Sequence, residues 1–244
     1  MRIDIIGLGG LPEVETGADL AALIREAAAA GGQPLDRQTV VAVAQKIVSK
    51  AEGCIVDLRA IEPSHLARGW AAEWGKDARV VELVLRESRR IVRMDRGVLI
   101  AETRHGFIAA NAGVDQSNVP GSDFATVLPR DPDASARRLR EALGCGAVIV
   151  TDTFGRPWRE GLVNVAIGVS GMEALEDWRG SADRQGRLLQ ATVLAAADEL
   201  AAAAGLVMVK NAGVPVALIR GFAFRPGEGS AAPLVRPAER DLFR

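Results

Sequence analysis

The sequence is poor in the side chains that build zinc sites and disulfides. It has two histidines and two cysteines among 244 residues, and Cys54 and Cys145 lie far apart with no Cys-x-x-Cys pair. A structural zinc site takes four Cys or His ligands, so this class of site is strongly disfavoured. We interpret both thiols as reduced packing residues of a cytoplasmic protein.

The sequence also lacks an excess of charge and a long apolar run. Thirty basic residues balance thirty-one acidic ones, so nothing indicates a nucleic-acid or membrane partner. The N-terminal MRIDIIGLGG is too short to be a signal sequence. The alanine-rich segment 191–205 is interrupted by Asp198 and Glu199 and does not span a bilayer. We expect a soluble protein that binds any anionic ligand through local groups.

The hydrophobic pattern predicts strands and helices that intermix without a regular βαβ order. The predicted strands are residues 3–8, 40–48, 98–102, 106–110, 147–150, 163–169 and 215–222. The predicted helices are residues 19–30, 77–92, 131–143 and 183–204, and the tail from residue 225 is predicted to be a loop. We expect one α+β domain over residues 1–244, with two interleaved subdomains as a variant, and neither a P-loop nor a Rossmann domain.

Four polar clusters follow predicted apolar strands, at residues 7–12, 45–50, 115–118 and 152–153. A strand fixes the backbone, so residues just past its end can hold a ligand with little freedom. The oxygens of Asp115, Asp152 and Thr153 suit Mg²⁺ or Mn²⁺, and Lys50 offers a cation to a phosphate. These residues alone indicate an enzyme that handles a metal and a phosphate group.

Each cluster also has an interpretation without a ligand. A loop aspartate such as Asp115 commonly bonds its own backbone, and a lysine such as Lys50 is commonly solvated. Asp152 follows four apolar residues, so its carboxylate must either leave the core or find a partner. The glycines at residues 7–10 match neither the dinucleotide-binding spacing nor GxxxxGK[ST].

The segment TDTFGRPWREG places two arginines around an indole. Trp158 can simply cover the core, or Arg156, Trp158 and Arg159 can together hold a planar anionic substrate. His105 is predicted to be a structural hydrogen-bonding residue. The Arg89–Arg90 pair is predicted to lie on the solvated face of a helix.

Several long, irregular segments resemble the coenzyme F420:L-glutamate ligase family. They are GLPEV at 10–14, QKIVSKAEG at 45–53, ETRHGFIAANAGVDQSNVPG at 102–121, TDTFGRPWREG at 151–161, VNVAIGVSGM at 163–172 and GVPVALIRGF at 213–222. The resemblance implies a GTP-dependent ligase that adds L-glutamate to the lactyl carboxylate of the deazaflavin F420 precursor, and then γ-linked glutamates. It also implies two Mg²⁺ or Mn²⁺ ions, K⁺ and an intertwined homodimer.

Other activities remain open beside this one. An amide ligase could act on a different carboxylate, and a non-catalytic module could bind GTP without turnover. A flavin-binding nitroreductase-like domain is fused to some relatives, and we expect the ligase part to stand alone here.

The resemblance assigns roles by position. Asp115 and Asp152 correspond to ligands of one metal, Thr153 corresponds to a ligand of a second metal, and Lys50 completes the catalytic set. The positions that correspond to nucleotide contacts are Leu11, Pro12, Glu13, Val14, Gln45, Lys50, Asn118, Met208, Val209, Lys210, Asn211, Ala212, Gly213, Val214 and Pro215.

Three positions depart from the family pattern. Leu162 and Asn164 stand where Gln and Asp are common, and Lys210 stands where some members carry an acidic or amide side chain near the metals. The second metal and the exact seat of the substrate depend on these positions.

Overall fold

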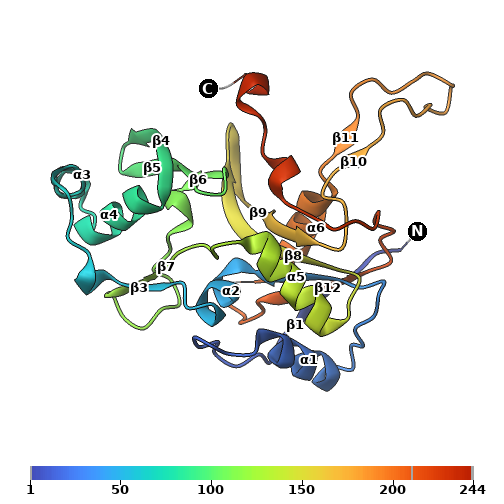
Figure 1. The fold of residues 1–244 in the computed structure, drawn as a ribbon, viewed down its shortest axis with the longest axis horizontal. Coiled ribbons are helices and arrows are strands. Elements are labelled where there is room, and N and C mark those ends of the chain that lie inside the picture. Colours follow the sequence, from blue (N-terminus) through green and yellow to red (C-terminus); the bar gives the residue numbers. More distant parts are fainter. Residues whose placement is uncertain (1, 210, 243–244) are drawn as a thin grey trace.

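A mixed sheet forms the centre of the computed structural model, which describes residues 2–209 and 211–242 (Figure 1). In these residues its five strands lie in the order β1 (Asp4–Leu8), β12 (Val216–Arg220), β2 (Val40–Ala44), β8 (Ala147–Arg156) and β9 (Arg159–Ser170). β2 and β8 are parallel, and the other neighbouring strands are antiparallel. The middle strands are rich in Val, Ile and Ala because both faces of the sheet are buried.

Helices cover both faces of this sheet. α1 (Leu20–Ala30), α2 (Gln45–Ala51) and α5 (Pro132–Leu143) contribute to the core on one face, and α6 (Ala196–Gly205) contributes to the core on the other. Successive strand residues point to opposite faces, so Val41 and Val43 join the first core while Val40 and Ala42 join the second. The predicted α+β class is confirmed.

A second group of elements lies beside the central sheet and has its own core (Figure 1). The chain enters this group through β3 (Ile55–Asp57) and leaves it through β7 (Phe124–Thr126), and these two strands pair with each other. Between them lie α3 (His65–Trp74), α4 (Ala78–Glu87), β4 (Ser88–Asp95), β5 (Val98–Thr103) and β6 (Ile108–Ala110). Residues 55–126 therefore form one unbroken insertion between α2 and α5.

The tail beyond residue 225 is irregular, as predicted. In the part of the chain that the structure describes, the tail has two 3₁₀ turns, η3 (Ala232–Leu234) and η4 (Ala238–Arg240), and an isolated bridge at Pro226. Asp133 on α5 holds the tail by accepting hydrogen bonds from Ser230 Oγ at 2.7 Å and Ala231 N at 2.9 Å. Across residues 2–209 and 211–242, no helix has the length and apolar character needed to cross a membrane.

Two predicted elements change type partway along. The predicted strand 40–48 ends at Ala44, and α2 begins at Gln45. Apolar residues run through both elements, and a short run cannot distinguish a strand from a buried helix turn. The predicted helix 77–92 ends at Glu87, because β-branched Ile91 and Val92 continue in β4.

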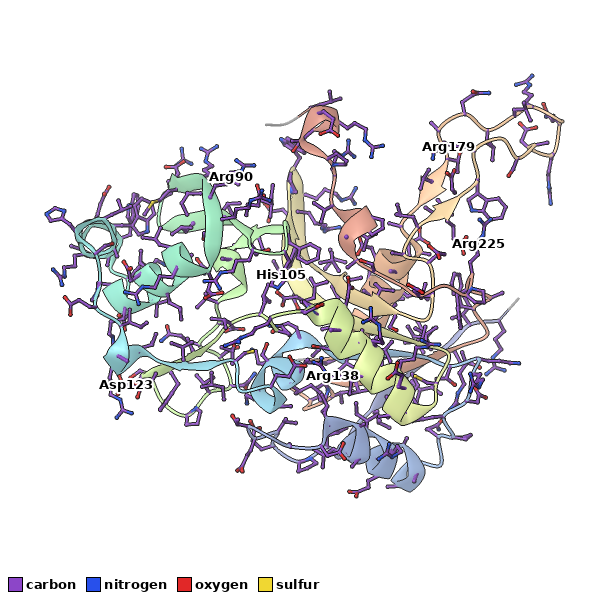
Figure 2. The ribbon with its side chains drawn as sticks, in the orientation of Figure 1. Arg90, His105, Asp123, Arg138, Arg179 and Arg225 are labelled. Carbon is purple, nitrogen blue, oxygen red and sulfur yellow. The ribbon has the colours of Figure 1, made fainter. Side chains whose placement is uncertain are left out.

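Arg89 and Arg90 are exposed, as predicted, but the helix predicted to carry them is wrong. Both residues lie on β4, where their guanidinium groups pair with Glu102 of β5 at 3.5 and 2.6 Å. Arg90 is labelled at this position in Figure 2. The pairing is a cross-strand contact that a helical assignment could not reveal.

The predicted helix 183–204 is wrong over its first half. Residues 176–194 form an extended arm that projects from the body, with β10 (Glu176–Asp177) paired to β11 (Val193–Leu194) (Figure 1). Gly180 N and Leu189 O bond across the arm at 2.9 Å, and Gly180 and Gly186 have positive φ. The helical spacing of the apolar residues has no core to face here, so the helix is confined to α6.

Candidate functional site

The parallel strands β2 and β8 bring two of the predicted clusters to one end of the central sheet, where the carboxyl ends of both strands lie. We call this end the ligation edge, after the reaction that the resemblance implies. Ala44 lies opposite Thr151 at this edge. Gln45 follows Ala44 directly and begins α2, and Asp152 follows Thr151. The clusters at 45–50 and 152–153 therefore lie at the same end of the sheet, as ligand-binding segments of parallel strands do.

Two loops that are distant in sequence reach the same edge. β1 ends at Leu8, which pairs with Val216 at the start of β12. The loop after β1 carries Leu11, Pro12, Glu13 and Val14, and the loop before β12 carries the segment 208–215. Pro215 O accepts a hydrogen bond from Ala44 N at 2.9 Å, which ties the second loop to the start of α2. Lys210 lies outside the described residues.

Asp115 is held against α2 by a cation. Its Oδ2 lies 2.7 Å from Lys46 Nζ, and its Oδ1 accepts a hydrogen bond of 2.7 Å from Ser117 N. Lys46 also bonds Ser117 Oγ. The backbone of Asp115 pairs with Thr126 of β7, which fixes the loop. Asp115 thus makes the local bond expected of a turn residue and also contacts a separate element.

These contacts favour the ionised form of Asp115. Burial of the carboxyl group opposes ionisation, but the Lys46 ammonium and the Ser117 donors outweigh it and hold the pKa of Asp115 below its usual value. Its side chain is 37% exposed, so a ligand can still reach it. The group is a carboxylate at neutral pH.

Lys50 is buried and not solvated, so the solvated interpretation is wrong. Its side chain is 6% exposed, and its ammonium pairs with the exposed carboxylate of Glu13. Glu13 comes from the loop after β1, so this pair joins two segments predicted to contact a nucleotide. Two lysines of α2 therefore hold one distant loop each: Lys46 holds the loop at Asp115, and Lys50 holds the loop at Glu13.

Lys46 was not among the predicted site residues. It lies one helical turn before Lys50, and residues at i and i+4 share a face of a helix. That spacing is a signal which could have drawn attention to it. The pairing with Asp115 joins residues 69 positions apart, and no local pattern in the sequence indicates such a contact.

Asp152 and Thr153 lie inside a strand and not just past its end, which corrects the prediction. β8 continues to Arg156 because β9 supplies partners along its whole length. Val148 and Val150 face the core that contains α2, so the alternation of the strand places Asp152 on that face and Thr153 on the other. Asp152 Oδ1 accepts a hydrogen bond from Thr153 N at 2.8 Å.

The hydroxyl of Thr153 donates a hydrogen bond to Asn164 Oδ1 on β9 at 2.9 Å. Asn164 is one of the positions that depart from the family pattern, and it lies beside Gly205 at the end of α6, where a Cβ would be 3.2 Å from its side chain. The Asn164 amide therefore accepts a hydrogen bond from the hydroxyl that was predicted to bind a second metal. The lone pairs of the Thr153 oxygen remain, and this hydrogen bond fixes their direction.

The donors at this end of the sheet suit hard divalent cations by their chemical type. Asp115 and Asp152 offer carboxylate oxygens, which Mg²⁺ and Mn²⁺ prefer, whereas the Thr153 hydroxyl lies on the opposite face of β8 and could serve only a separate ion. The ammonium of Lys46 already lies against Asp115, which shows that positive charge is stable there. Among the described residues no three His, Cys, Asp or Glu gather into a metal-binding cluster, so phosphate oxygens would have to complete the coordination.

The turn between β8 and β9 carries Arg156, Trp158 and Arg159. Trp158 has φ of 57° and is 79% exposed, so the interpretation that it covers the core is wrong. Arg156 Nη2 donates to Glu160 O at 2.6 Å, which closes the turn. The turn lies four residues along β8 from Asp152, a distance of roughly 13 Å at the rise of a strand.

His105 has the structural role predicted for it. Its Nε2 lies 3.1 Å from Arg130 O, so this nitrogen carries the proton and donates it. The imidazole stacks on Phe107, which in turn meets the edge of Phe154 on β8. Figure 2 shows His105 between the second group of elements and α5, where it joins the two parts.

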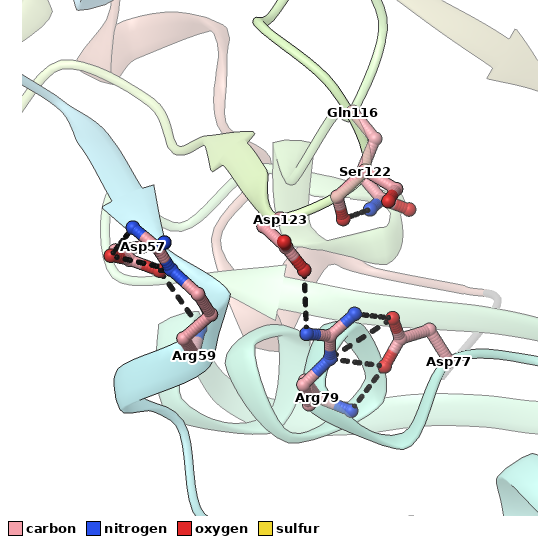
Figure 3. A network of polar contacts seen from close by, with 7 residues as sticks. All are labelled: Asp57, Arg59, Asp77, Arg79, Gln116, Ser122 and Asp123. Carbon is pink, nitrogen blue, oxygen red and sulfur yellow. Dashed lines mark hydrogen bonds and ion pairs between the residues drawn. The ribbon is translucent and has the colours of Figure 1, made fainter.

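The loop that follows Asp115 is braced by polar contacts (Figure 3). Gln116 Nε2 donates to Ser122 O at 3.2 Å, and Arg79 Nη1 donates to Asp123 Oδ1 at 2.9 Å. Arg79 also forms a two-pronged pair with Asp77 at the start of α4. The base of the loop is therefore fixed to the second group of elements, which positions Asp115 toward α2.

Comparisons with known proteins extend over the whole chain. A family model described as F420-0:Gamma-glutamyl ligase matches residues 9–221. The coenzyme F420:L-glutamate ligase of Methanothermobacter thermautotrophicus is 48% identical over 252 residues, which cover 100% of both chains. The enzyme of that name from Methanopyrus kandleri is 45% identical, covering 97% of this chain and 100% of its own. That of Methanocaldococcus jannaschii is 39% identical, covering 100% and 97%.

Proposed function

The chain belongs to the F420-0:gamma-glutamyl ligase family, and from this premise we propose that it joins L-glutamate to a carboxylate of the coenzyme F420 precursor. The observation that carries the proposal is the 48% identity over the full length of a relative named for this reaction. The enzyme is a nucleotide-dependent ligase. The convergence of the predicted nucleotide, phosphate and metal segments at one sheet edge supports the same reaction.

The chemistry of a carboxylate explains the need for a nucleotide. An oxide ion is a very poor leaving group, so an amine cannot displace it directly. In the proposed reaction a carboxylate oxygen, that of the lactyl group, attacks the γ-phosphorus of GTP and GDP departs. The amine of glutamate then attacks the acyl carbon, phosphate leaves, and the nitrogen loses a proton. Later cycles add glutamates through γ-linkages.

The lysines of α2 are the proposed phosphate-binding groups. Lys46 and Lys50 lie one helical turn apart and each is paired with a carboxylate, Asp115 or Glu13. On binding, a phosphate would replace those carboxylates as the partner of the ammonium groups. Both lysines would then be paired with an anion before and after binding. The nucleotide would further contact the loops at 11–14 and 208–215, together with Gln45 and Asn118.

Asp115 and Asp152 are the proposed holders of a divalent cation, Mg²⁺ or Mn²⁺, with Thr153 toward a second ion. When bound, such a cation offsets the negative charge of the phosphates and helps to align the γ-phosphate with the substrate carboxylate. The protein's part is to keep Asp115 ionised and both aspartates fixed. Lys46 and Ser117 hold Asp115 in its ionised form, and the Thr153 amide donates a hydrogen bond that orients Asp152.

Arg156, Trp158 and Arg159 are the proposed seat of the planar, anionic precursor. The exposed indole offers a stacking face, and the arginines offer charge to the phosphodiester. A homodimer, a requirement for K⁺ and a cytoplasmic location also belong to the proposal. The projecting arm exposes Leu188, Val193 and Leu194, and a second copy would be one way to cover them.

A mass-spectrometric assay tests the proposed function. The purified protein is incubated with GTP, Mn²⁺, K⁺, L-glutamate and the glutamate-free precursor, and product masses are read over time. We expect increments of one glutamyl residue, each matched by one GDP released. Omission of the precursor should stop GDP release.

Two outcomes of this assay would contradict the proposal. GTP binding without precursor-dependent GDP release would indicate a non-catalytic module. Activity that appears with another carboxylic acid and not with the precursor would indicate a different amide ligase.

A further inference from the structure

A cavity of about 610 Å³ lies at the end of the central sheet opposite Asp115 and Asp152. Its lining comes from the residues that precede β2 and β8, from those that follow β9 and β12, and from Arg140 of α5. The volume falls within the range of small-molecule sites. None of the residues assigned to ligation lines it, so the proposed function leaves the cavity without a role.

The lining is positively charged. It contains Arg37 and Arg140 and no aspartate or glutamate. Cys145 adds no negative charge, because burial raises the pKa of its thiol to about 11. The described lining therefore offers two guanidinium groups to an anion and holds no carboxylate. The exposed Glu173 lies outside this lining, against Gly227.

Arg140 is held in place while the end of its side chain is left available. Its Nε donates to Gly146 O at 3.2 Å. The side chain passes over Gly171, where φ is +88° and an added Cβ would lie 2.6 Å from that Nε. Within residues 2–209 and 211–242, neither the terminal nitrogens of Arg140 nor the side chain of Arg37 has a hydrogen-bond or ion-pair partner.

Aromatic side chains supply a second part of the lining. Phe222 and Phe224 are half-buried, pack against the core beneath the sheet and also line the cavity. The ring of Phe224 lies close to bare backbone, because a Cβ at Gly146 would be 2.8 Å from its Cζ. Flat apolar surface thus lies beside the two arginines, a combination that suits a ring bearing an acidic group.

We propose that this cavity binds a planar organic anion, with its ring against Phe222 and Phe224 and its phosphate or carboxylate on Arg37 and Arg140. The site is separate from the edge that holds Asp115 and Lys50. β2 and β8 run from the cavity to that edge, so an occupant would contact the starts of the strands whose ends carry the proposed catalytic groups.

Flavin mononucleotide and riboflavin are a matched pair of probes, because they share a ring and differ by one phosphate. Fluorescence anisotropy of each is followed as the full-length protein is added. We expect saturable binding of the mononucleotide and at least roughly tenfold weaker binding of riboflavin, since a charge-assisted pair is worth about 1.5–3 kcal/mol. Arg37→Gln and Arg140→Gln should each weaken the mononucleotide roughly tenfold.

Matched variants separate this site from the ligation edge. Arg137→Gln changes an exposed arginine of α5 that does not line the cavity, and it should leave binding unchanged. Lys50→Ala should also leave it unchanged. Arg37 has no described partner to lose, so Arg37→Gln tests the site even if Arg140→Gln lowers the melting temperature.

The proposal is overturned by any of three results. These are no saturable binding of the mononucleotide, equal binding of riboflavin, or binding that Arg37→Gln leaves unchanged. The last result would place the probe outside the cavity, near the lysines of α2 if Lys50→Ala weakens binding and at the β8–β9 turn if Trp158→Ala does. If the unmodified protein binds the mononucleotide in the cavity but adds no glutamate to the precursor, the result counts against the proposed function alone.

Discussion

The two ends of the central sheet differ in how their charges are arranged. At the end that carries Asp115 and Lys50, each described cation of α2 is paired with a carboxylate from another loop. At the opposite end, Arg37 and Arg140 share a cavity with no acidic side chain. At the first end, an anionic ligand must replace the carboxylates that already pair with the lysines. At the second end, it would pair with two arginines that have no acidic partner in the described lining.

A third arrangement shows what a purely structural carboxylate looks like. Asp133 accepts hydrogen bonds from Val169 N at 2.8 Å, Ala231 N at 2.9 Å and Ser230 Oγ at 2.7 Å. All its partners are fixed parts of the fold. Asp115 instead pairs with the ammonium of a lysine side chain and stays partly exposed. The contrast predicts that Asp115 governs the rate of ligation and that Asp133 governs the free energy of unfolding.

The largest effect should follow removal of charge at the ligation edge. Asp115→Asn or Asp152→Asn should lower the rate of glutamate addition by at least ~10³-fold, because a neutral amide no longer fixes the cation that offsets the phosphate charge. The melting temperature should change little. Asp4→Asn, at the start of β1 where Asp4 pairs with the exposed Arg2, is the control and should retain most activity. Near-normal turnover of either variant at saturating Mn²⁺ would remove the site assignment.

Asp133→Ala should show the opposite behaviour. Three hydrogen bonds are lost and two backbone N–H groups are left unsatisfied, so we expect a loss of about 2–4 kcal/mol in the free energy of unfolding, measured in urea. The folded fraction should ligate normally at 25 °C. Unchanged stability together with weakened ligation would show that the contrast between the two aspartates is mistaken.

Local signals in the sequence were enough to predict several elements. The helix at residues 131–143 has a capping Asp131, which accepts Ala134 N at 2.9 Å, and it ends at Gly144 with φ of 66°. Each of these signals lies within a few residues of the boundary that it sets. The four polar clusters were also recognisable, because each follows an apolar run.

Local signals failed where a neighbouring strand or a distant segment of the same chain decides the structure. Residues 88–92 have helical spacing, yet they form β4 because β5 lies alongside to pair with them. Residues 183–194 have similar spacing but lie in the projecting arm, where the described contacts come from the arm's other strand and Val193 and Leu194 stay exposed. The contacts of Lys46 with Asp115 and of Lys50 with Glu13 join distant segments, so they became visible only in the folded chain.

Substitutions in the Lys50–Glu13 pair should have an intermediate effect on the use of GTP. Lys50→Ala removes a phosphate-binding charge, and we expect kcat/KM for GTP to fall roughly 10- to 100-fold, as for the loss of one charge-assisted contact. Glu13→Gln removes the carboxylate that competes with phosphate for Lys50, so the affinity for GTP should rise severalfold. Steady-state kinetics at fixed glutamate and precursor measure both. An unchanged KM and kcat for GTP in Lys50→Ala would remove its phosphate role.

The smallest effect concerns the ionisation of Asp115. Burial raises its pKa, and Lys46 together with Ser117 lowers it below the usual value, so removal of Lys46 should raise it. The carboxylate is the functional form and is lost as the pH falls through its pKa. The acid limb of kcat/KM in Lys46→Met should therefore lie at higher pH than in the unmodified protein, whereas Lys76→Met, an exposed control, should not move it. Carbon NMR titration of the Asp115 carboxyl gives the same comparison without turnover, and equal pKa values in the two proteins would show that the Lys46 pair does not control this aspartate.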